Sequence, residues 1–169
     1  MQIQFYDTKE KIKTSFKPID ATNIKFYVCG PTVYERAHIG NARPAVVFDL
    51  LFRFLRNIFG QECVTYVRNY TDIDDKINQK ALESGKSIKT ITDETIQWYR
   101  QDMRRLNVLE PTKSPRATEY IEAMIDMIKI LVDKKNAYLD GTGQVLFSVK
   151  SYSGYGLLSH RKLDEMISG

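Results

Sequence analysis

A strand, a loop, a helix and a second strand follow one another within about 45 residues, and this order limits the possible fold more than any other feature of the sequence. Residues 24–29 and 63–67 are rich in β-branched and aromatic side chains, as strands are. Between them, apolar residues recur at helical spacing over residues 42–58, with Pro44 in the first turn and Gly60 as a stop. This succession predicts a right-handed crossover, and hence an α/β fold with a parallel nucleotide-binding sheet.

Beyond residue 69 the sequence predicts mostly helices. The expected helices span residues 75–83 and 92–106, and a further one begins with Thr118 as its cap. A small β-hairpin is expected at residues 137–147, where Asp140-Gly141-Thr142-Gly143 supplies the turn, and another helix at residues 159–167. The inner face of the helix capped by Thr118 is predicted to consist of Ile121, Met124, Ile125, Ile128, Leu131 and Val132.

Composition narrows the class of protein. The net charge is +4, from 25 basic and 21 acidic residues, which permits a polyanionic partner without singling one out. The two cysteines, Cys29 and Cys63, lie far apart with no C-x-x-C, so neither a disulfide framework nor a zinc knuckle is indicated, and by residue type alone both are expected to be buried small side chains. The sequence has neither a long apolar window nor a signal-peptide pattern, so we expect a cytoplasmic protein without a membrane partner.

The two loops that follow the predicted strands are the candidate site, because ligands of open α/β sheets bind at the carboxyl ends of the strands. The first loop, residues 29–41, leads into a helix N-terminus, where free backbone N–H groups favour a phosphate. Gly40 would let a phosphate approach the backbone, and His38 and Asn41 could donate hydrogen bonds. A helix-capping Asn41 and a packed surface His38 explain the same residues, so the pattern alone leaves both interpretations open.

The second loop, residues 68–76, contains the run Thr71-Asp72-Ile73-Asp74-Asp75. For Asp74 and Asp75 we prefer the interpretation of a cap and a first-turn acid at the start of a helix. A magnesium site is disfavoured there, because adjacent carboxylates in a strand-to-helix turn point in different directions.

Residues 38–41, His-Ile-Gly-Asn, resemble the HIGH signature of class I aminoacyl-tRNA synthetases, with Asn41 in place of the final histidine. The flanking residues 27–34 and 66–76 are similar to cysteinyl-tRNA synthetases specifically, and residues 115–118 and 155–159 resemble later segments of the same family. The match therefore covers nearly the whole chain in order. It implies the Rossmann-like catalytic fold of the class I enzymes.

The resemblance also implies roles for individual residues. His38 and Asn41 would be catalytic, holding the ATP phosphates while the substrate carboxylate attacks the α-phosphorus. Cys29 would be one of four zinc ligands, and the metal would select the thiolate of cysteine over the hydroxyl of serine. The substrate cysteine would contact Cys29, Gly30 and Thr71. The residues implied to bind ATP, which the family uses with magnesium, are Gly30, Pro31, Thr32, His38, Gly40 and Asn41.

Several parts that the family needs do not occur in the sequence. It has no K-M-S-K-S loop, no identifiable partners for Cys29 at the zinc, and no anticodon-binding domain. We therefore expect the first half of a catalytic domain in residues 1–111 and the start of a helical and β-hairpin connective insertion in residues 112–169. The complete enzyme would be a monomer that joins L-cysteine to tRNA(Cys) for translation, and the isolated chain would be inactive.

Three alternatives remain open on the sequence. A cysteine ligase of mycothiol biosynthesis would share the catalytic domain but join cysteine to an amino sugar. A non-catalytic module could keep affinity for ATP or tRNA. An unrelated nucleotidyltransferase with the same turn would use ATP without depending on cysteine.

Overall fold

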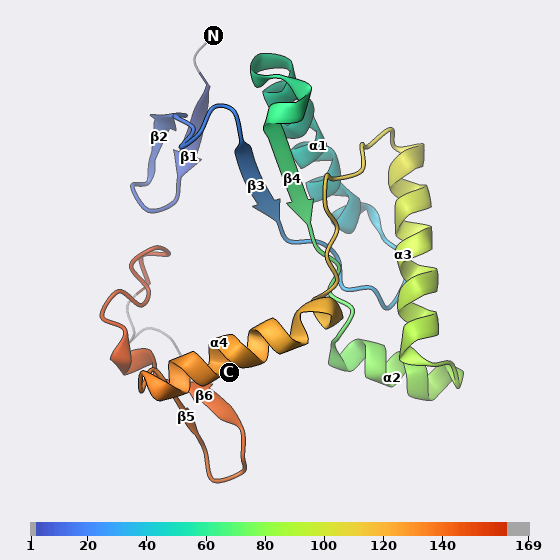
Figure 1. Cartoon of the computed structure of the whole chain (residues 1–169). Helices are drawn as coiled ribbons and strands as arrows, with labels where there is room; N and C mark the ends of the chain where they lie inside the picture. Colours follow the sequence, from blue (N-terminus) through green and yellow to red (C-terminus); the bar gives the residue numbers. More distant parts are fainter. Residues whose placement is uncertain (1–2, 162–169) are drawn as a thin grey trace. The chain divides into compact units, whose positions relative to one another are not determined.

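The computed structural model describes residues 3–161 and divides the chain into two compact units (Figure 1). One unit runs from Pro18 to Tyr120, and the other combines Met1–Lys17 with Ile121–Gly169. The candidate site belongs wholly to the first unit, so the two units are described separately. No helix within residues 3–161 is both long and apolar enough to cross a membrane.

The crossover predicted from the sequence is confirmed in the unit Pro18–Tyr120. Strand β3 (Ile24–Val28) pairs in parallel with β4 (Val64–Arg68), and helix α1 (Ile39–Phe59) connects them, followed by the short 3-10 helix η1 (Gln61–Cys63) (Figure 1). This α/β arrangement is the Rossmann-like half that was expected.

Helix α1 begins three residues earlier than predicted, at Ile39. As a result, Pro44 lies in the second turn instead of the first. The helix buries the stripe Ala42, Ala45, Asp49, Phe52 and Leu55, whose members are three or four residues apart. Its other apolar residues, including Val46 and Leu50, remain exposed.

The core of this unit has an aromatic part and a mixed part. Tyr66 on β4 has no exposed surface; its ring stacks on Phe26 with 4.5 Å between centroids and contacts Phe52 of α1 at 5.3 Å. These contacts attach α1 to the sheet. The mixed part is formed by Val33, Ala42, Ala45, Tyr70, Ile96, Tyr99, Met103 and Val108.

Helices α2 (Asp75–Ser84) and α3 (Ile88–Arg105) complete the unit. Asp74 caps α2 by accepting a hydrogen bond from the Lys76 amide at 2.9 Å, which confirms the interpretation of this residue as a cap. Helix α3 starts four residues before the predicted position, because Ser87 serves as its cap.

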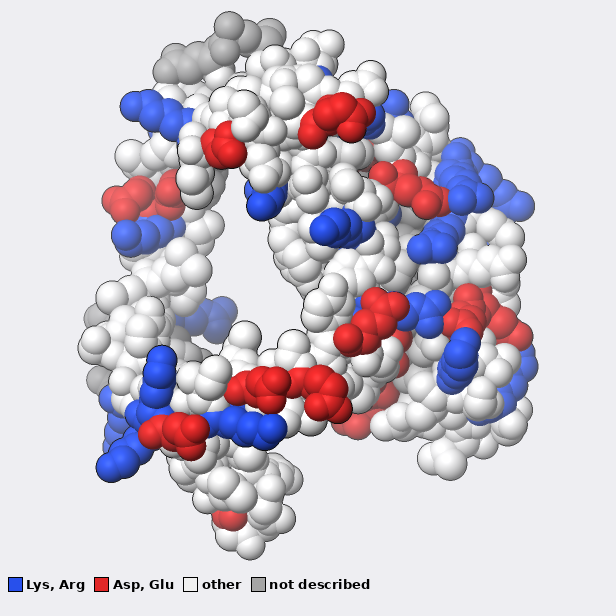
Figure 2. All heavy atoms as spheres, viewed as in Figure 1, with Lys and Arg blue, Asp and Glu red and all other residues white. Residues whose placement is uncertain are grey.

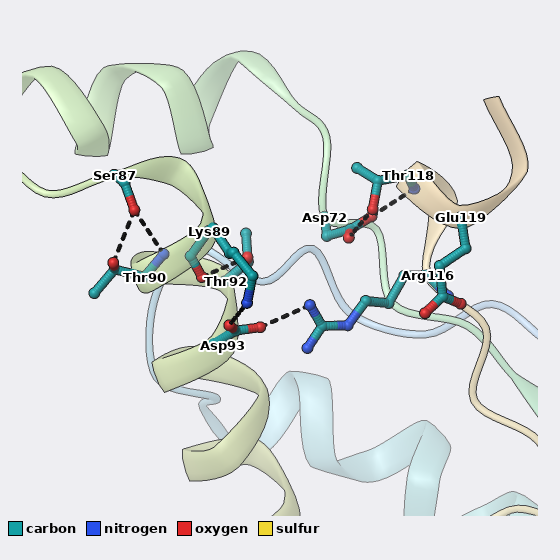
Figure 3. Close-up of polar contacts among 9 residues, drawn as sticks. All are labelled: Asp72, Ser87, Lys89, Thr90, Thr92, Asp93, Arg116, Thr118 and Glu119. Carbon is teal, nitrogen blue, oxygen red and sulfur yellow. Dashed lines mark hydrogen bonds and ion pairs between the residues drawn. The ribbon is translucent and has the colours of Figure 1, made fainter.

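An extended segment beside β4 leads to the short 3-10 helix η2 (Ala117–Tyr120). The prediction that Thr118 caps a helix is wrong. Its hydroxyl and amide both donate to the carboxylate of Asp72, at 2.6 and 3.0 Å, and Asp72 is 3% exposed (Figure 3). Nearby, Arg116 forms an ion pair with Asp93 of α3 at 2.7 Å. Two interactions thus attach the end of this unit to its interior.

The described part of the second unit contains two hairpins, one α-helix and a short 3-10 helix. Strands β1 (Gln4–Asp7) and β2 (Ile12–Ser15) form an antiparallel pair that the sequence did not predict. Strands β5 (Ala137–Leu139) and β6 (Val145–Phe147) form the predicted hairpin, and the short 3-10 helix η3 (Val149–Ser151) follows.

Helix α4 (Ile121–Asp133) starts three residues after Thr118. The sequence predicted that this helix buries an inner face. This prediction is wrong, because no residue of α4 is buried. Charged side chains of both signs lie along the surface of this helix (Figure 2). The helix expected at residues 159–167 lies mostly outside the described residues, and residues 159–160 form a turn.

Candidate functional site

The two candidate loops meet at the carboxyl ends of β3 and β4. The Val33 amide donates to the Thr71 carbonyl and the Thr71 amide donates to the Pro31 carbonyl, both at 3.0 Å, so Thr32 and Thr71 form a parallel bridge. The strand pairing therefore continues past the ends of both strands. Two stretches far apart in sequence are held in one register, as the rule for ligand sites of parallel sheets requires.

Gly30 lies where the two loops come closest. Its amide donates to the side-chain oxygen of Asn69 at 2.7 Å. A Cβ atom at residue 30 would fall 1.7 Å from the backbone oxygen of Asn69, so only glycine fits without moving the backbone. The glycine that the family resemblance assigned to ATP and cysteine also has this structural role.

His38 and Asn41 cap α1 reciprocally. The Nδ1 atom of His38 accepts a hydrogen bond from the Gly40 amide at 3.0 Å, and the side-chain oxygen of Asn41 accepts one from the His38 amide at 3.1 Å. A Cβ atom at residue 40 would lie 2.7 Å from Cε1 of His38. The small Gly40 is thus what allows the imidazole to lie over the helix end.

This capping fixes which atoms remain available for a ligand. A ring nitrogen that accepts a hydrogen bond carries no proton, so the proton of the neutral His38 ring is on Nε2. Neither Nε2 of His38 nor the side-chain nitrogen Nδ2 of Asn41 has a hydrogen-bond partner within residues 3–161, whereas the backbone amide of Asn41 donates to the His38 carbonyl at 3.0 Å. The capping role and the donor role that were alternatives on the sequence therefore use different atoms of the same side chains.

Pro44 frees one more polar group at the start of α1. Helix geometry would pair the Gly40 carbonyl with the amide of residue 44, but proline has no N–H. Gly40 and Pro44 both line a cavity of about 120 Å³ at the site. The carbonyl of Gly40 is thus an acceptor without its helical partner beside that cavity.

This cavity, called the β4 cavity below, brings together several of the predicted residues. A smaller neighbouring hollow of about 40 Å³ involves the turn before α1, including Pro31, Thr32, His38 and Asn41. Thr71 is not among the residues that line either space, although its backbone pairs with the same loop. The residues that line the β4 cavity are Cys29, Gly30, Pro31, Gly40, Asn41, Pro44, Ala45, Arg68 and Tyr99.

Cys29 and Cys63 differ from the expectation based on residue type. Cys29 is exposed, and its thiol donates a long hydrogen bond of 3.6 Å to the Gly30 carbonyl. Cys63 is half-buried. Within the described part of the chain, no cluster of three or more histidine, cysteine or acidic side chains is placed to hold a metal ion.

Two buried residues of the β4 cavity, Arg68 and Tyr99, were not named as site residues from the sequence, although Arg68 lies in the second candidate loop. Arg68 is 4% exposed and Tyr99 is 3% exposed. Their sequence signals exist: Val64, Tyr66 and Arg68 alternate along β4, so they share its buried face, and Tyr99 lies one helical turn after Ile96. Desolvation by burial raises the pKa of Tyr99 to about 12, so the phenol stays protonated at neutral pH.

The loop before α1 is anchored to α3 by an ion pair. The Arg36 guanidinium donates two hydrogen bonds to the Asp102 carboxylate, both at 3.1 Å. These hydrogen bonds lower the pKa of Asp102 below its usual value. The ion pair therefore connects the loop before α1 to α3.

Known proteins are similar to this chain in sequence. Cysteine–tRNA ligase of Ruegeria sp. (strain TM1040) is 56% identical over 99% of the chain, and that of Xanthobacter autotrophicus (strain ATCC BAA-1158 / Py2) is 51% identical over all of it. In both cases the match spans 36% of the relative, so the chain covers about a third of the relatives' length.

The fold also has a solved counterpart. It is similar to the crystal structure of the ternary complex of Agrobacterium radiobacter K84 agnB2 LeuRS-tRNA-LeuAMS, with a TM-score of 0.57 at 20% identity over 82% of this chain and 19% of that one. The family model described as "tRNA synthetases class I (C) catalytic domain" matches residues 15–169. The chain therefore belongs to the family of class I (C) tRNA synthetases.

Proposed function

We propose that this chain is part of a cysteine–tRNA ligase, which activates L-cysteine with ATP and magnesium to cysteinyl-adenylate and transfers it to tRNA(Cys). The observation that carries the proposal is the reciprocal cap at the start of α1. It leaves Nε2 of His38 and the side-chain nitrogen Nδ2 of Asn41 without partners among residues 3–161, next to the end of a parallel sheet. The names of the relatives support the choice of cysteine and tRNA.

In this proposal, His38 and Asn41 donate hydrogen bonds to the ATP phosphates as charge develops on the departing pyrophosphate. Donors that are already oriented need little reorganisation during the reaction, and each is worth roughly 10²–10³-fold in rate. Asn41 replaces the usual histidine as a neutral donor. Gly30, Pro31, Thr32 and Gly40 would approach ATP through their backbones, and Thr71 would contact the amino acid.

Zinc enters the proposal only through Cys29. Its exposed thiol fits one position of a tetrahedral site, but residues 3–161 supply no cluster that would complete four ligands. The donor set of this part of the chain is therefore insufficient on its own, and we derive no reaction step through zinc. The domain boundary after residue 111, the cytoplasmic location and the monomeric state of the complete enzyme likewise stay predictions.

Cysteine-dependent ATP–pyrophosphate exchange tests the proposal. It should be run on this chain and on the longest in-frame product of its gene, with serine as the control amino acid. We expect exchange with cysteine and not serine in the longer product. Transfer of cysteine to an amino sugar instead of tRNA would indicate the mycothiol alternative, and exchange without cysteine would contradict the proposal.

The substitution Asn41→Asp separates the donor role from the capping role. Aspartate keeps the oxygen that accepts from the His38 amide, and a negative charge near a helix N-terminus is favourable. The thermal stability should therefore stay unchanged, whereas exchange should fall about 10²-fold or more because a phosphate donor is replaced by an anion. Asn57→Ala in the last turn of α1 is the matched control and should leave both unchanged. Full exchange by the Asn41→Asp variant would exclude the donor role.

A further inference from the structure

Arg68 is a buried cation without an acidic partner. Its guanidinium donates one long hydrogen bond, 3.3 Å, to the Tyr66 hydroxyl, and within residues 3–161 it forms no ion pair. An arginine stays charged in proteins, and a buried charge is costly unless it is compensated. The position therefore requires a compensating group.

Aromatic rings supply part of that compensation. The guanidinium carbon of Arg68 lies 5.7 Å from the Tyr66 ring centroid and 5.4 Å from that of Tyr99, within the range of cation–π contacts. Such contacts use the faces of the rings and leave most guanidinium N–H groups without acceptors. Within the described residues, each side-chain nitrogen of Arg68 that lacks a hydrogen-bond partner keeps some solvent-accessible surface. These unpaired N–H groups can therefore reach the space that Arg68 lines.

Tyr99 carries a second donor and lines the same space, as well as the smaller neighbouring hollow. Its ring is almost fully buried, its hydroxyl has no hydrogen-bond partner among residues 3–161, and it too lines the β4 cavity. Because burial keeps the phenol protonated, this hydroxyl can donate. Arg68 from β4 and Tyr99 from α3 thus present donors to a cavity whose lining also includes Gly40 and Asn41.

We propose that Arg68 and Tyr99 hold a small oxyanion, a phosphate or a carboxylate, in the β4 cavity. A planar guanidinium with several N–H donors matches both kinds of oxyanion, and the low surrounding dielectric strengthens the attraction. The cavity of about 120 Å³ has room for one such group. The origin of the oxyanion rests on the proposed function: the phosphates would come from ATP and the carboxylate from cysteine.

Direct binding to the wild-type chain is the first test, because it needs no turnover. The ¹⁵N-labelled chain is titrated with inorganic pyrophosphate and, separately, with acetate, while the Nε–H signal of Arg68 is followed by NMR. We expect a saturable shift of that signal with at least one of the two anions. If the signal stays in place with both, the proposal is overturned, whatever the exchange assay shows.

Variants then locate the binding. Arg68→Gln should weaken binding of the anion about tenfold or more, and Tyr99→Phe about threefold. Arg105→Gln, an exposed arginine on α3, is the control for general charge and should change binding less than twofold. Equal effects of Arg68→Gln and Arg105→Gln would overturn the proposal. If Arg68→Gln fails to fold, Arg68→Lys keeps the charge while losing the planar fork, and it should weaken binding by a smaller factor.

Competition identifies the source of the oxyanion. Displacement of pyrophosphate by ATP assigns the site to a phosphate. Displacement of acetate by L-cysteine, but not by cysteamine, which lacks the carboxylate, assigns it to the amino acid. Anion binding without any cysteine-dependent exchange in the longer product would refute the proposed function and leave the oxyanion site standing.

Discussion

Helices α3 and α4 differ in how many of their residues are buried. Helix α3 has a modest apolar content and two arginines at its end, yet it buries six residues, among them Ile96, Tyr99 and Met103. Helix α4, with the sequence IEAMIDMIKILVD, is far more apolar and buries none. A repeating pattern therefore predicts that a helix forms, but burial depends on whether another element of the chain covers it.

Helices α1 and α4 both expose apolar side chains in this chain. Val46, Val47 and Leu50 of α1 are exposed, as are Met124 and Ile128 of α4. The relatives are about three times as long as this chain. Covered patches of this kind are normal inside a larger protein, whereas exposed ones favour association.

The largest difference is expected from one substitution made on both helices. Ile96→Ala on α3 removes a side chain that is 3% exposed, and it should lower the free energy of unfolding by about 2–5 kcal/mol. Ile128→Ala on α4, at a residue that is 40% exposed, should cost less than about 0.5 kcal/mol. Urea unfolding followed by the fluorescence of Trp98, the single tryptophan, measures the first, and circular dichroism the second. Equal losses would contradict the comparison.

The next largest effect concerns the segment that precedes α4. Thr118→Val keeps the shape of the side chain but removes the hydroxyl that donates to the buried Asp72 carboxylate. The loss should be about 2 kcal/mol, because a hydrogen bond to a charged, buried group is removed. Glu119→Gln, at an exposed residue of the same turn, is the control. If Thr118→Val left the free energy of unfolding unchanged, Asp72 would have another hydrogen-bond donor in the variant.

A smaller, pH-dependent effect is expected for Tyr99 on α3. Its pKa is about 12 in the folded chain against 10.0 ordinarily, so folding disfavours the ionised phenol. The stability is unaffected below pH 10 and falls as the pH rises toward 12, by about 1.4 kcal/mol at pH 11. Tyr99→Phe should remove this part of the alkaline loss, which unfolding curves at pH 8 and pH 11 would show. An identical loss in wild type and variant would contradict the assignment.

The smallest effect involves Asp93 at the start of α3. Hydrogen bonds from Lys89 and then Arg116 lower the pKa of this carboxyl. The contribution of these hydrogen bonds to the stability of the folded chain is present above the ordinary pKa of an aspartate, and it disappears as the pH falls through the lowered pKa of Asp93. Lys89→Gln should therefore raise the pKa of Asp93 in a carbon-detected NMR titration and barely change the stability at pH 7. Lys129→Gln on the exposed α4 is the control and should leave Asp93 unaffected.

Local features of the sequence predicted the crossover well. The strands around residues 24–28 and 64–68 and the body of α1 depend on β-branched content and helical spacing, which short stretches of chain determine. The start of α1 was missed by three residues because His38, an unusual cap, replaces the common Ser, Thr, Asp or Asn. His38 and Asn41 were already candidate phosphate donors because of their place at a helix N-terminus after a strand, and the family resemblance added the role at ATP, which stays a prediction.

Long-range contacts could not be predicted in this way. Thr118 was expected to cap a helix, but Asp72, which is 46 residues away, accepts both of its hydrogen bonds. Arg68 was part of the second candidate loop without a role of its own, and only the fold reveals that its guanidinium lies near the rings of Tyr66 and Tyr99. Which polar group compensates a buried one is decided by tertiary packing, and a single sequence does not contain that information locally.

The parallel pairing of β3 with β4 also has a consequence for synthesis on the ribosome. Ile24 of β3 is synthesised before its pairing partner Val64 of β4. At about 5–20 residues per second, the time between the synthesis of these two residues is roughly 2–8 s. During this time β3 has two unpaired edges, which is the state in which a nascent strand can pair with another chain. Lys25, exposed near the start of this otherwise apolar strand, places a charge on it at that stage. A charge on a strand disfavours such pairing with another chain, so Lys25 opposes it before β4 has been made.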